Sequence, residues 1–181
     1  MNNLEQNNAE KERVEFVIDQ VSPKDAYDIQ KLILDAAREV YLNGGKTVEE
    51  IEKNAEVALS HDSIKKVAEG LSEFTENDKG IVAKVGDRIV GYFSVERGDD
   101  KNEVKAAFVL PEFQGKGIAS KLWNDIKGFL NPDVDTYLGV YSTNVNAINF
   151  YKKLGFEETG KISTGRILPE MEMVLKSVKA K

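Results

Sequence analysis

The chain has no cysteine among its 181 residues and only one histidine, His61. Without cysteine there is no disulfide, no thiolate metal ligand and no cysteine nucleophile, a composition typical of proteins from a reducing compartment. One histidine also leaves few ligands for a zinc site. No apolar run approaches the ~20 residues that span a bilayer. We therefore expect a cytoplasmic protein with no metal site and no contact with membranes.

Acidic side chains outnumber basic ones by 31 to 25, which gives a formal net charge of −6. The excess lies in residues 1–79, whose net charge is −8, whereas residues 80–181 carry +2. Nucleic-acid phosphates are held chiefly by Lys and Arg, so a net-acidic chain without a basic stripe is poorly suited to bind them. The two halves are expected to meet different partners.

The length and the 41% share of hydrophobic residues suit one domain with an ordinary core. Residues 1–12 are rich in Asn, Gln, Glu and Lys and lack an apolar centre, so we expect a disordered tail there. Residues 13–181 are expected to form a single domain, because no repeat or linker interrupts them.

The spacing of apolar residues predicts the order strand, helices, three strands, helix, strand, helix and two strands. Ser22-Pro23 is a helix start, and Thr47 and Ser60 are expected to cap two further helical pieces. This order predicts an α/β fold with a mixed sheet. Strands are expected over residues 13–19, 81–85, 88–95, 103–110, 136–141, 156–162 and 168–175, and the later helices over 118–129 and 144–154.

The segment from Val109 to Ala119 joins a strand end to a helix start. Such a junction presents unpaired N–H groups and the positive end of the helix dipole, and Gly115 and Gly117 let an anion approach the main chain. We interpret it as a pyrophosphate cradle to which Lys116 adds charge. For a lone Gly-x-Gly pair, an ordinary glycine turn is the alternative.

Two other phosphate motifs fit the sequence less well. A P-loop ending in Gly45-Lys46-Thr47 would need a glycine at Val40, and the segment follows a helix. A Rossmann fingerprint over Gly115-x-Gly117-x-x-Ser120 is one glycine short and lacks a series of βαβ units around it. An enzyme with a nucleotide cofactor remains an alternative on this ground.

A second notable segment runs from Asn144 to Phe156. Each of its residues has a structural explanation, because Asn144 is a natural N-cap, Gly155 ends a helix and Tyr151 suits a half-buried position. Taken together, however, this segment and the glycine segment form a combined pattern that an ordinary helix and turn do not explain.

The two segments resemble the GNAT superfamily of acyl-CoA-dependent N-acyltransferases. The first reads Val-x-Pro-x-x-Gln-x-x-Gly-x-Ala from Val109, and the second reads Asn-x-x-Ala-x-x-Phe-Tyr-x-x-x-Gly-Phe from Asn144. The resemblance implies a mixed, mostly antiparallel central sheet flanked by helices, with acetyl-CoA as co-substrate. It implies that Tyr151 is the general acid and that the cofactor is bound by Val109, Gln114, Gly115, Gly117, Ala119 and Asn144. Lys116 and Ile118, in the same segment, complete the expected cofactor site.

Acyl transfer to an amine requires a neutral nucleophile, yet an amine of pKa near 10.4 is unprotonated in only about one molecule in 2,500 at pH 7. A general base is therefore expected, and Glu103 is the first candidate because it lies six residues before Val109, near the base of some family members. Glu96 is the second candidate, and a solvated strand-end carboxylate is the alternative for Glu103. Because the chain has no cysteine, we predict direct attack in a ternary complex.

The acceptor is expected to be a primary amine that meets the acidic helical half of the chain. Clustered carboxylates there would attract a polyamine or another small cationic amine, although exposed helices are commonly charged in any case. A CoA-binding sensor without catalysis and a protein N-terminal or lysine acetyltransferase are the alternatives, and a homodimer is left open. The carboxylates are Glu49, Glu50, Glu52 and Glu56.

Overall fold

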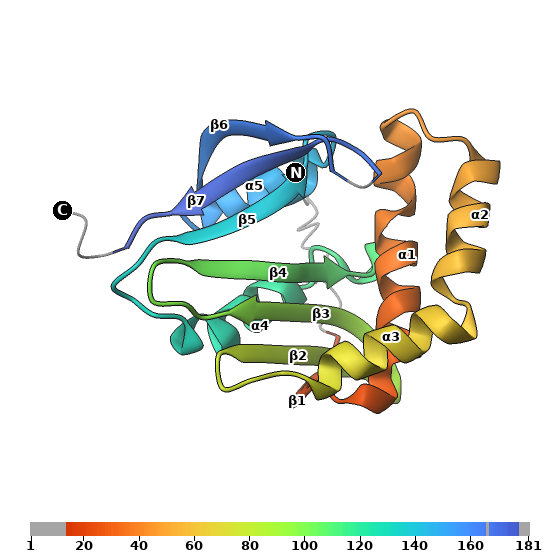
Figure 1. Cartoon of the computed structure of the whole chain (residues 1–181), viewed down its shortest axis with the longest axis horizontal. Coiled ribbons are helices and arrows are strands. Elements are labelled where there is room, and N and C mark those ends of the chain that lie inside the picture. Colours follow the sequence, from red (N-terminus) through yellow and green to blue (C-terminus); the bar gives the residue numbers. More distant parts are fainter. Residues whose placement is uncertain (1–13, 166, 178–181) are drawn as a thin grey trace, which may run out of the picture.

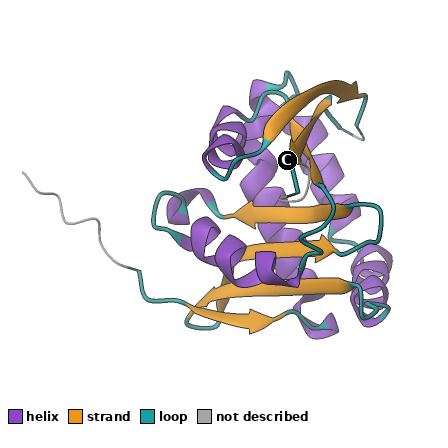
Figure 2. Ribbon diagram, turned by 90° about the vertical axis from the view of Figure 1, so that its left-hand side faces the viewer, coloured by secondary structure: helices purple, strands orange, loops and turns teal. Residues whose placement is uncertain are grey.

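The computed structural model describes residues 14–165 and 167–177, so the predicted tail over 1–12 lies outside the described residues. Helices cover both sides of the sheet that these residues form (Figures 1 and 2). The strands are β1 (Val17–Gln20), β2 (Asp78–Val85), β3 (Arg88–Glu96), β4 (Asn102–Val109), β5 (Thr136–Tyr141), β6 (Glu157–Ser163) and β7 (Glu170–Leu175). The helices are α1 (Ala26–Asn43), α2 (Val48–Ala58), α3 (His61–Ser72), α4 (Ile118–Ile126) and α5 (Val145–Lys153).

The strands form one seven-stranded sheet in the order β1-β2-β3-β4-β5-β7-β6. Neighbouring strands are antiparallel except β4 and β5, which run parallel. The predicted α/β class, with a mixed and mostly antiparallel sheet flanked by helices, is confirmed. The predicted order of strands and helices along the chain is also the observed one.

The parallel strands β4 and β5 stay together only at one end. They pair from Asn102 opposite Thr136 to Val104 opposite Leu138, and no later pair joins them in the described residues. Figure 1 shows the two strands spreading apart toward α1. Across β3, the register jumps so that Lys105 is an extra residue on β4. A bulge of this kind bends its strand, which favours the divergence of β4 from β5.

A buried amide holds the closed end of this opening. The side chain of Asn102 is fully buried. Its Nδ2 donates to the Asn131 carbonyl at 2.8 Å and to Thr136 Oγ1 at 3.2 Å, and its Oδ1 accepts from the N–H of Asn131 at 3.0 Å. Because a buried amide is costly unless it is bonded, this set of contacts fixes where β4 begins relative to β5.

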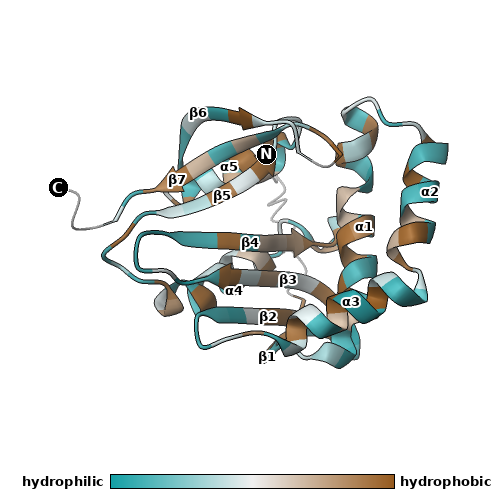
Figure 3. Cartoon of the chain, in the orientation of Figure 1, coloured by the Kyte–Doolittle hydropathy of each residue, from teal (hydrophilic) through white to brown (hydrophobic). Residues whose placement is uncertain are grey.

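Helices α4 and α1 pack on opposite faces of the sheet. A Cβ at Gly91 of β3 would lie 2.9 Å from Leu122 and 3.1 Å from Ile118, so glycine there lets α4 approach closely. On the other face α1 packs against β3 and β4. Figure 3 shows hydrophobic residues along β3 and one side of α1, whereas long stretches of α2 and α3 are hydrophilic.

The first strand is shorter than predicted. Of the strand expected over residues 13–19, the residue at position 13 lies outside the described range, and Val14 to Phe16 are not in a strand. The length of β1 is limited by its partner strand β2. The two strands pair from Val17 opposite Lys84, and β2 ends one residue later at Val85. In this register Val85 stands opposite Phe16, and Val14 and Glu15 lie beyond the end of β2.

None of the helices in the described ranges combines the length and the hydrophobicity that crossing a bilayer requires.

Candidate functional site

An inner cavity of about 300 Å³ occupies the opening between β4 and β5. Phe108 of β4 and Val140 of β5 line two of its sides, and Asn144 and Tyr151 line it from the α5 side. The local divergence of two parallel strands thus creates a space inside the sheet that side chains do not fill.

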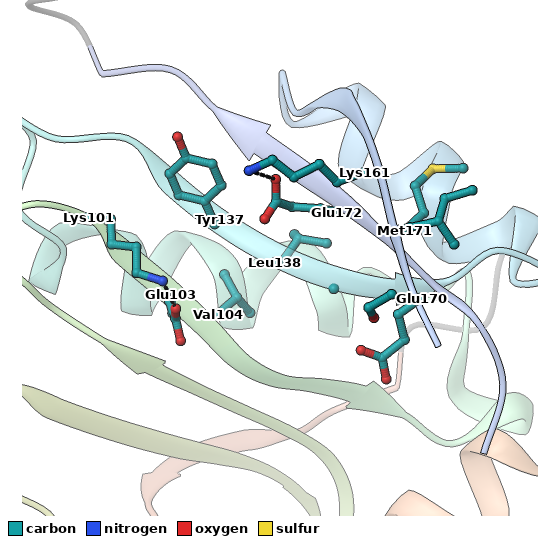
Figure 4. Close-up of a pocket in the computed structure, with 12 residues that line it drawn as sticks. Lys101, Glu103, Val104, Tyr137, Leu138, Lys161, Glu170, Met171 and Glu172 are labelled. Carbon is teal, nitrogen blue, oxygen red and sulfur yellow. Dashed lines mark hydrogen bonds and ion pairs between the residues drawn. The ribbon is translucent and has the colours of Figure 1, made fainter. Parts of the chain in front are cut away.

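An outer cavity of about 400 Å³ adjoins it and extends over β5, β7 and β6 (Figure 4). The two cavities share residues from the paired ends of β4 and β5 and from the start of β7, so they meet at the opening in the sheet. The shared residues are Glu103, Val104, Leu138, Gly139 and Glu170. Two molecules, one bound in each cavity, would meet there.

The loop before α4 has the backbone geometry that an anion site needs. Gly115 and Gly117 have φ angles of +73° and +86°, in the region that favours glycine, and a Cβ at either position would meet nothing within 4 Å. Among the described residues, the N–H groups from Gly115 to Gly117 have no main-chain acceptor. The first turn of α4 carries no acidic side chain and no side-chain cap. These donors and the helix dipole are therefore free to attract an anion.

The cationic side chains near this loop pack on one aromatic ring. The Lys116 ammonium lies 5.4 Å from the centroid of Phe113, and the Arg88 guanidinium lies 5.6 Å from it on an exposed surface. Arg88 is also paired with Glu112 at 2.8 Å. Positive charge therefore stands beside the loop that was predicted to hold a diphosphate.

Tyr151 lies in α5 and lines the inner cavity. Its side chain is 6% exposed, and its ring packs against Phe150 and Phe156, with centroids 5.5 and 5.7 Å away. No hydrogen-bond partner for its hydroxyl is found in the described part of the chain. Burial raises the pKa of Tyr151 above its usual value, so the phenol remains protonated at neutral pH.

Asn144 has the capping role that its position suggests. Its Oδ1 accepts the N–H of Ala147 at 3.1 Å, while the residue also lines the inner cavity. The neighbouring Thr143 has a buried Oγ1 without a hydrogen-bond partner in the described residues. Thr143 itself lines neither cavity.

Glu103 lines both cavities, but basic side chains flank it. It accepts hydrogen bonds from Lys101 and, at 2.9 Å, from Lys105. These two bonds lower the pKa of Glu103 and make its carboxylate a weaker base. Glu96, the second candidate base, pairs with Lys105 at 3.3 Å and lines neither cavity.

The acidic side chains of α2 do not reach either cavity. Glu50 closes a capping box with Thr47, and its carboxylate accepts the Thr47 N–H at 2.8 Å. Glu52 pairs with Arg38 at 3.7 Å, and Glu49 and Glu56 are exposed. His61 is an exposed residue at the start of α3. Over residues 14–165 and 167–177, no group of three or more side chains suited to hold a metal ion is found.

Sequence reasoning missed Glu170, which lines both cavities. The alternation of Met171 and Met173 with Glu172 predicted the strand, but nothing in it separates Glu170 from an ordinary exposed carboxylate. Its position becomes visible only once β7 is placed beside β5.

Residues 47–177 match the sequence model of the acetyltransferase (GNAT) domain. Uncharacterized N-acetyltransferases from Mycobacterium tuberculosis and Mycobacterium bovis are 34% identical over 83 residues, which are 44% of this chain and 53% of theirs. The chain therefore spans about half the length of the curated relatives it matches.

Solved structures show the same fold. The PaiA N-acetyltransferase of Thermoplasma acidophilum, in complex with coenzyme A, superposes with a TM-score of 0.68 at 19% identity and covers 90% of this chain and 99% of its own. A GCN5-related N-acetyltransferase from Rhodopseudomonas palustris gives a TM-score of 0.66 at 18% identity, covering 88% and 94%.

Proposed function

Because the chain belongs to the GNAT family of acetyltransferases, we propose that it transfers an acetyl group from acetyl-CoA to a primary amine by direct attack in a ternary complex. One observation carries this proposal: the parallel strands β4 and β5 separate beyond Val104 and Leu138, and the two cavities meet at that opening. A thioester in one cavity and an amine in the other would come together there.

The residues of the chain suit a CoA-type ligand. The free N–H groups around Gly115 and Gly117, together with the start of α4, would hold the diphosphate, and Lys116 would add charge. Val109 at the end of β4 and Asn144 at the start of α5 would hold the pantetheine arm. Acetyl-CoA supplies an activated thioester carbonyl. Ile118 and Ala119 would contribute through their main-chain N–H groups.

Tyr151 is the proposed general acid. Its protonated hydroxyl would donate to the sulfur that departs from the acetyl group. Since burial raises the pKa of Tyr151 and a thiol has a pKa of about 8.5, complete proton transfer is uphill. Stabilising the developing charge by a hydrogen bond is therefore the main contribution expected from this residue.

Glu103 is the proposed base. As the amine must lose a proton before it attacks, a carboxylate where the cavities meet is well placed to receive that proton, directly or through water. The bonds from Lys101 and Lys105 keep Glu103 ionised and make it a weak base. A water relay that ends in bulk solvent is therefore part of the proposal.

The acceptor proposed here is a small cationic amine such as a polyamine. The support comes from the carboxylates of Glu103, Glu170 and Glu172 around the outer cavity. The lack of cysteine supports an activity in a reducing compartment such as the cytoplasm.

Thiol release from acetyl-CoA, measured with polyamines, amino acids, aminoglycosides and peptide N-termini, tests the proposal. We expect turnover with at least one small cationic amine. Tight CoA binding without turnover on any amine would instead identify a CoA-binding sensor, and turnover on peptides alone would identify a protein acetyltransferase. Displacement of CoA by NADH or ATP at low concentration would contradict the proposed cofactor.

A further inference from the structure

The carboxylates around the outer cavity differ in how they are neutralised. Glu103 is bonded to the amines of Lys101 and Lys105, although Lys105 also contacts a carboxylate outside the cavity. Glu172 lies 3.3 Å from the amine of Lys161. Each of these two carboxylates thus has a basic partner within the chain, and an incoming cation would have to compete with it.

Glu170 differs from both. It lies on β7 opposite Tyr141 of β5 and lines both cavities, and Figure 4 shows its carboxylate projecting toward the space between β4 and β5. A Cβ at Gly139 would lie 3.0 Å from Glu170 Oε2, so the missing side chain leaves room for the carboxylate. Over residues 14–165 and 167–177, no ion pair or hydrogen bond to this carboxylate is found. In the described part of the site its charge has no counter-ion.

Two aromatic rings border this carboxylate. Tyr41 of α1 and Tyr141 form a T-shaped pair with centroids 5.6 Å apart and hydroxyl oxygens 3.4 Å apart. Burial raises the pKa of Tyr41, and the hydrogen bond with Tyr141 and the charge of Glu170 raise it further, so Tyr41 carries no competing charge at neutral pH. A carboxylate beside aromatic rings favours an organic cation over a neutral molecule.

An unpaired donor faces the same inner cavity from α5. Tyr151 is 6% exposed, and its hydroxyl lacks a partner in the described residues. The inner cavity is therefore lined by an unpaired phenol on α5 and an unpaired carboxylate on β7. These groups suit the two sides of an acetyl transfer, the departing thiolate and the incoming ammonium.

We propose that Glu170 binds the ammonium group of a primary alkylamine acceptor where the two cavities meet, and so makes the protein selective for cationic acceptors. The inference rests on the proposed function and deepens it. It assigns recognition of the amine to a half-buried residue of β7 rather than to Glu103 or to the exposed carboxylates of α2.

Calorimetric titration of the full-length, CoA-loaded protein with spermidine and with n-butylamine tests this role apart from catalysis. Glu170→Gln removes the charge and keeps the shape, Glu170→Asp keeps the charge, and Glu157→Gln is the control, since Glu157 is exposed on β6 and lines neither cavity. We expect Glu170→Gln to weaken amine binding by about 10- to 100-fold, which corresponds to about 1.4 to 2.8 kcal/mol. Glu170→Asp should retain most of the affinity, and Glu157→Gln all of it.

CoA affinity and melting temperature should be the same in all three variants, which separates recognition from folding. If Glu170→Gln fails to fold, Gly139→Ala provides a second variant, because it crowds Glu170 Oε2 without changing any charge and should also weaken amine binding. Amine affinity that is unchanged in Glu170→Gln, or no binding of either amine to the wild-type protein, would overturn the role of Glu170.

The two proposals fail differently. A wild-type protein that binds spermidine through Glu170 but releases no thiol with any amine would contradict the acetyltransferase activity and leave the recognition role standing. Thiol release with an unchanged KM for amines in Glu170→Gln would contradict the recognition role of Glu170 and leave the acetyltransferase activity standing.

Discussion

The side-chain amide of Gln114 donates a hydrogen bond to the main-chain carbonyl of Val109, 3.1 Å away. This bond ties the end of β4 to the loop that leads into α4. The main-chain N–H of Gln114 also bonds within the loop, to the Pro111 carbonyl at 3.1 Å. Gln114 therefore braces the loop, and the donors without a main-chain acceptor begin after it, at Gly115.

Gln114→Ala should weaken CoA binding by removing this brace. One neutral hydrogen bond contributes about 0.5 to 1.5 kcal/mol, so the Kd for CoA should rise by about 2- to 13-fold. Isothermal titration calorimetry with CoA measures this change. Gln20→Ala, at an exposed position on β1, is the control and should leave the Kd unchanged. An equal Kd in both variants would mean that the brace does not shape the site.

Alanine substitutions at Gly117 and at Gly70 should have opposite effects on stability. Gly117 has a φ of +86°, so a side chain there is strained by about 1 to 2 kcal/mol, although space is available for it. Gly70 lies inside α3 with open space around it, and Gly70→Ala should stabilise the helix by about 0.5 to 1 kcal/mol. Urea denaturation measures both changes, and CoA titration should show weaker binding only in Gly117→Ala.

Tyr151→Phe should lower kcat by about 100-fold, at the lower end of the range for a general acid, because the phenol works mainly through a hydrogen bond. Stability should change by less than about 0.5 kcal/mol, since the hydroxyl has no partner in the described residues. Steady-state thiol release measures kcat. Tyr92→Phe, a buried tyrosine on β3 that lines neither cavity, should keep full activity. A Tyr151→Phe protein as active as wild type would contradict the assignment.

Stability should fall as the pH rises above about 10. Burial raises the pKa of Tyr41, Tyr92 and Tyr151 above the ordinary 10.0. In alkaline solution the unfolded chain therefore binds fewer protons than the folded chain, and the free energy of unfolding decreases with pH. At pH 11 each tyrosine contributes up to about 1.4 kcal/mol to this loss.

Urea denaturation between pH 8 and pH 11 measures this dependence. Tyr151→Phe should make the fall shallower, because one titrating group is gone. Identical pH dependence in wild type and Tyr151→Phe would show that this phenol does not resist ionisation in the folded protein.

Signals that span a few residues predicted much of the fold. Thr47 and Glu50 form the predicted capping box, Ser60 accepts the Ser63 N–H at the start of α3, and Gly86-Asp87 joins β2 to β3. The strand over 136–141 has the predicted bounds. These features depend on caps, turns and alternation, all of which are local properties of the chain.

The site depends on relations over longer distances that no local pattern contains. The separation of β4 from β5 follows from pairing between residues 34 positions apart, such as Val104 and Leu138, and from the extra residue Lys105 opposite β3. Glu103 was predicted as a base from its distance to Val109, but the flanking lysines that lower its pKa become evident only in the folded strand. The role of Glu103 as the base stays a prediction.

The single parallel pairing in the sheet also has a mechanical consequence. Within residues 14–165 and 167–177, three residue pairs, from Asn102 to Val104 on β4, join the first four strands of the sheet to the last three. A ligand bound between β4 and β5 would contact both groups of strands and add to the few contacts that hold them together. Part of its binding free energy would then appear as resistance to unfolding, so occupancy should be readable as a rise in melting temperature.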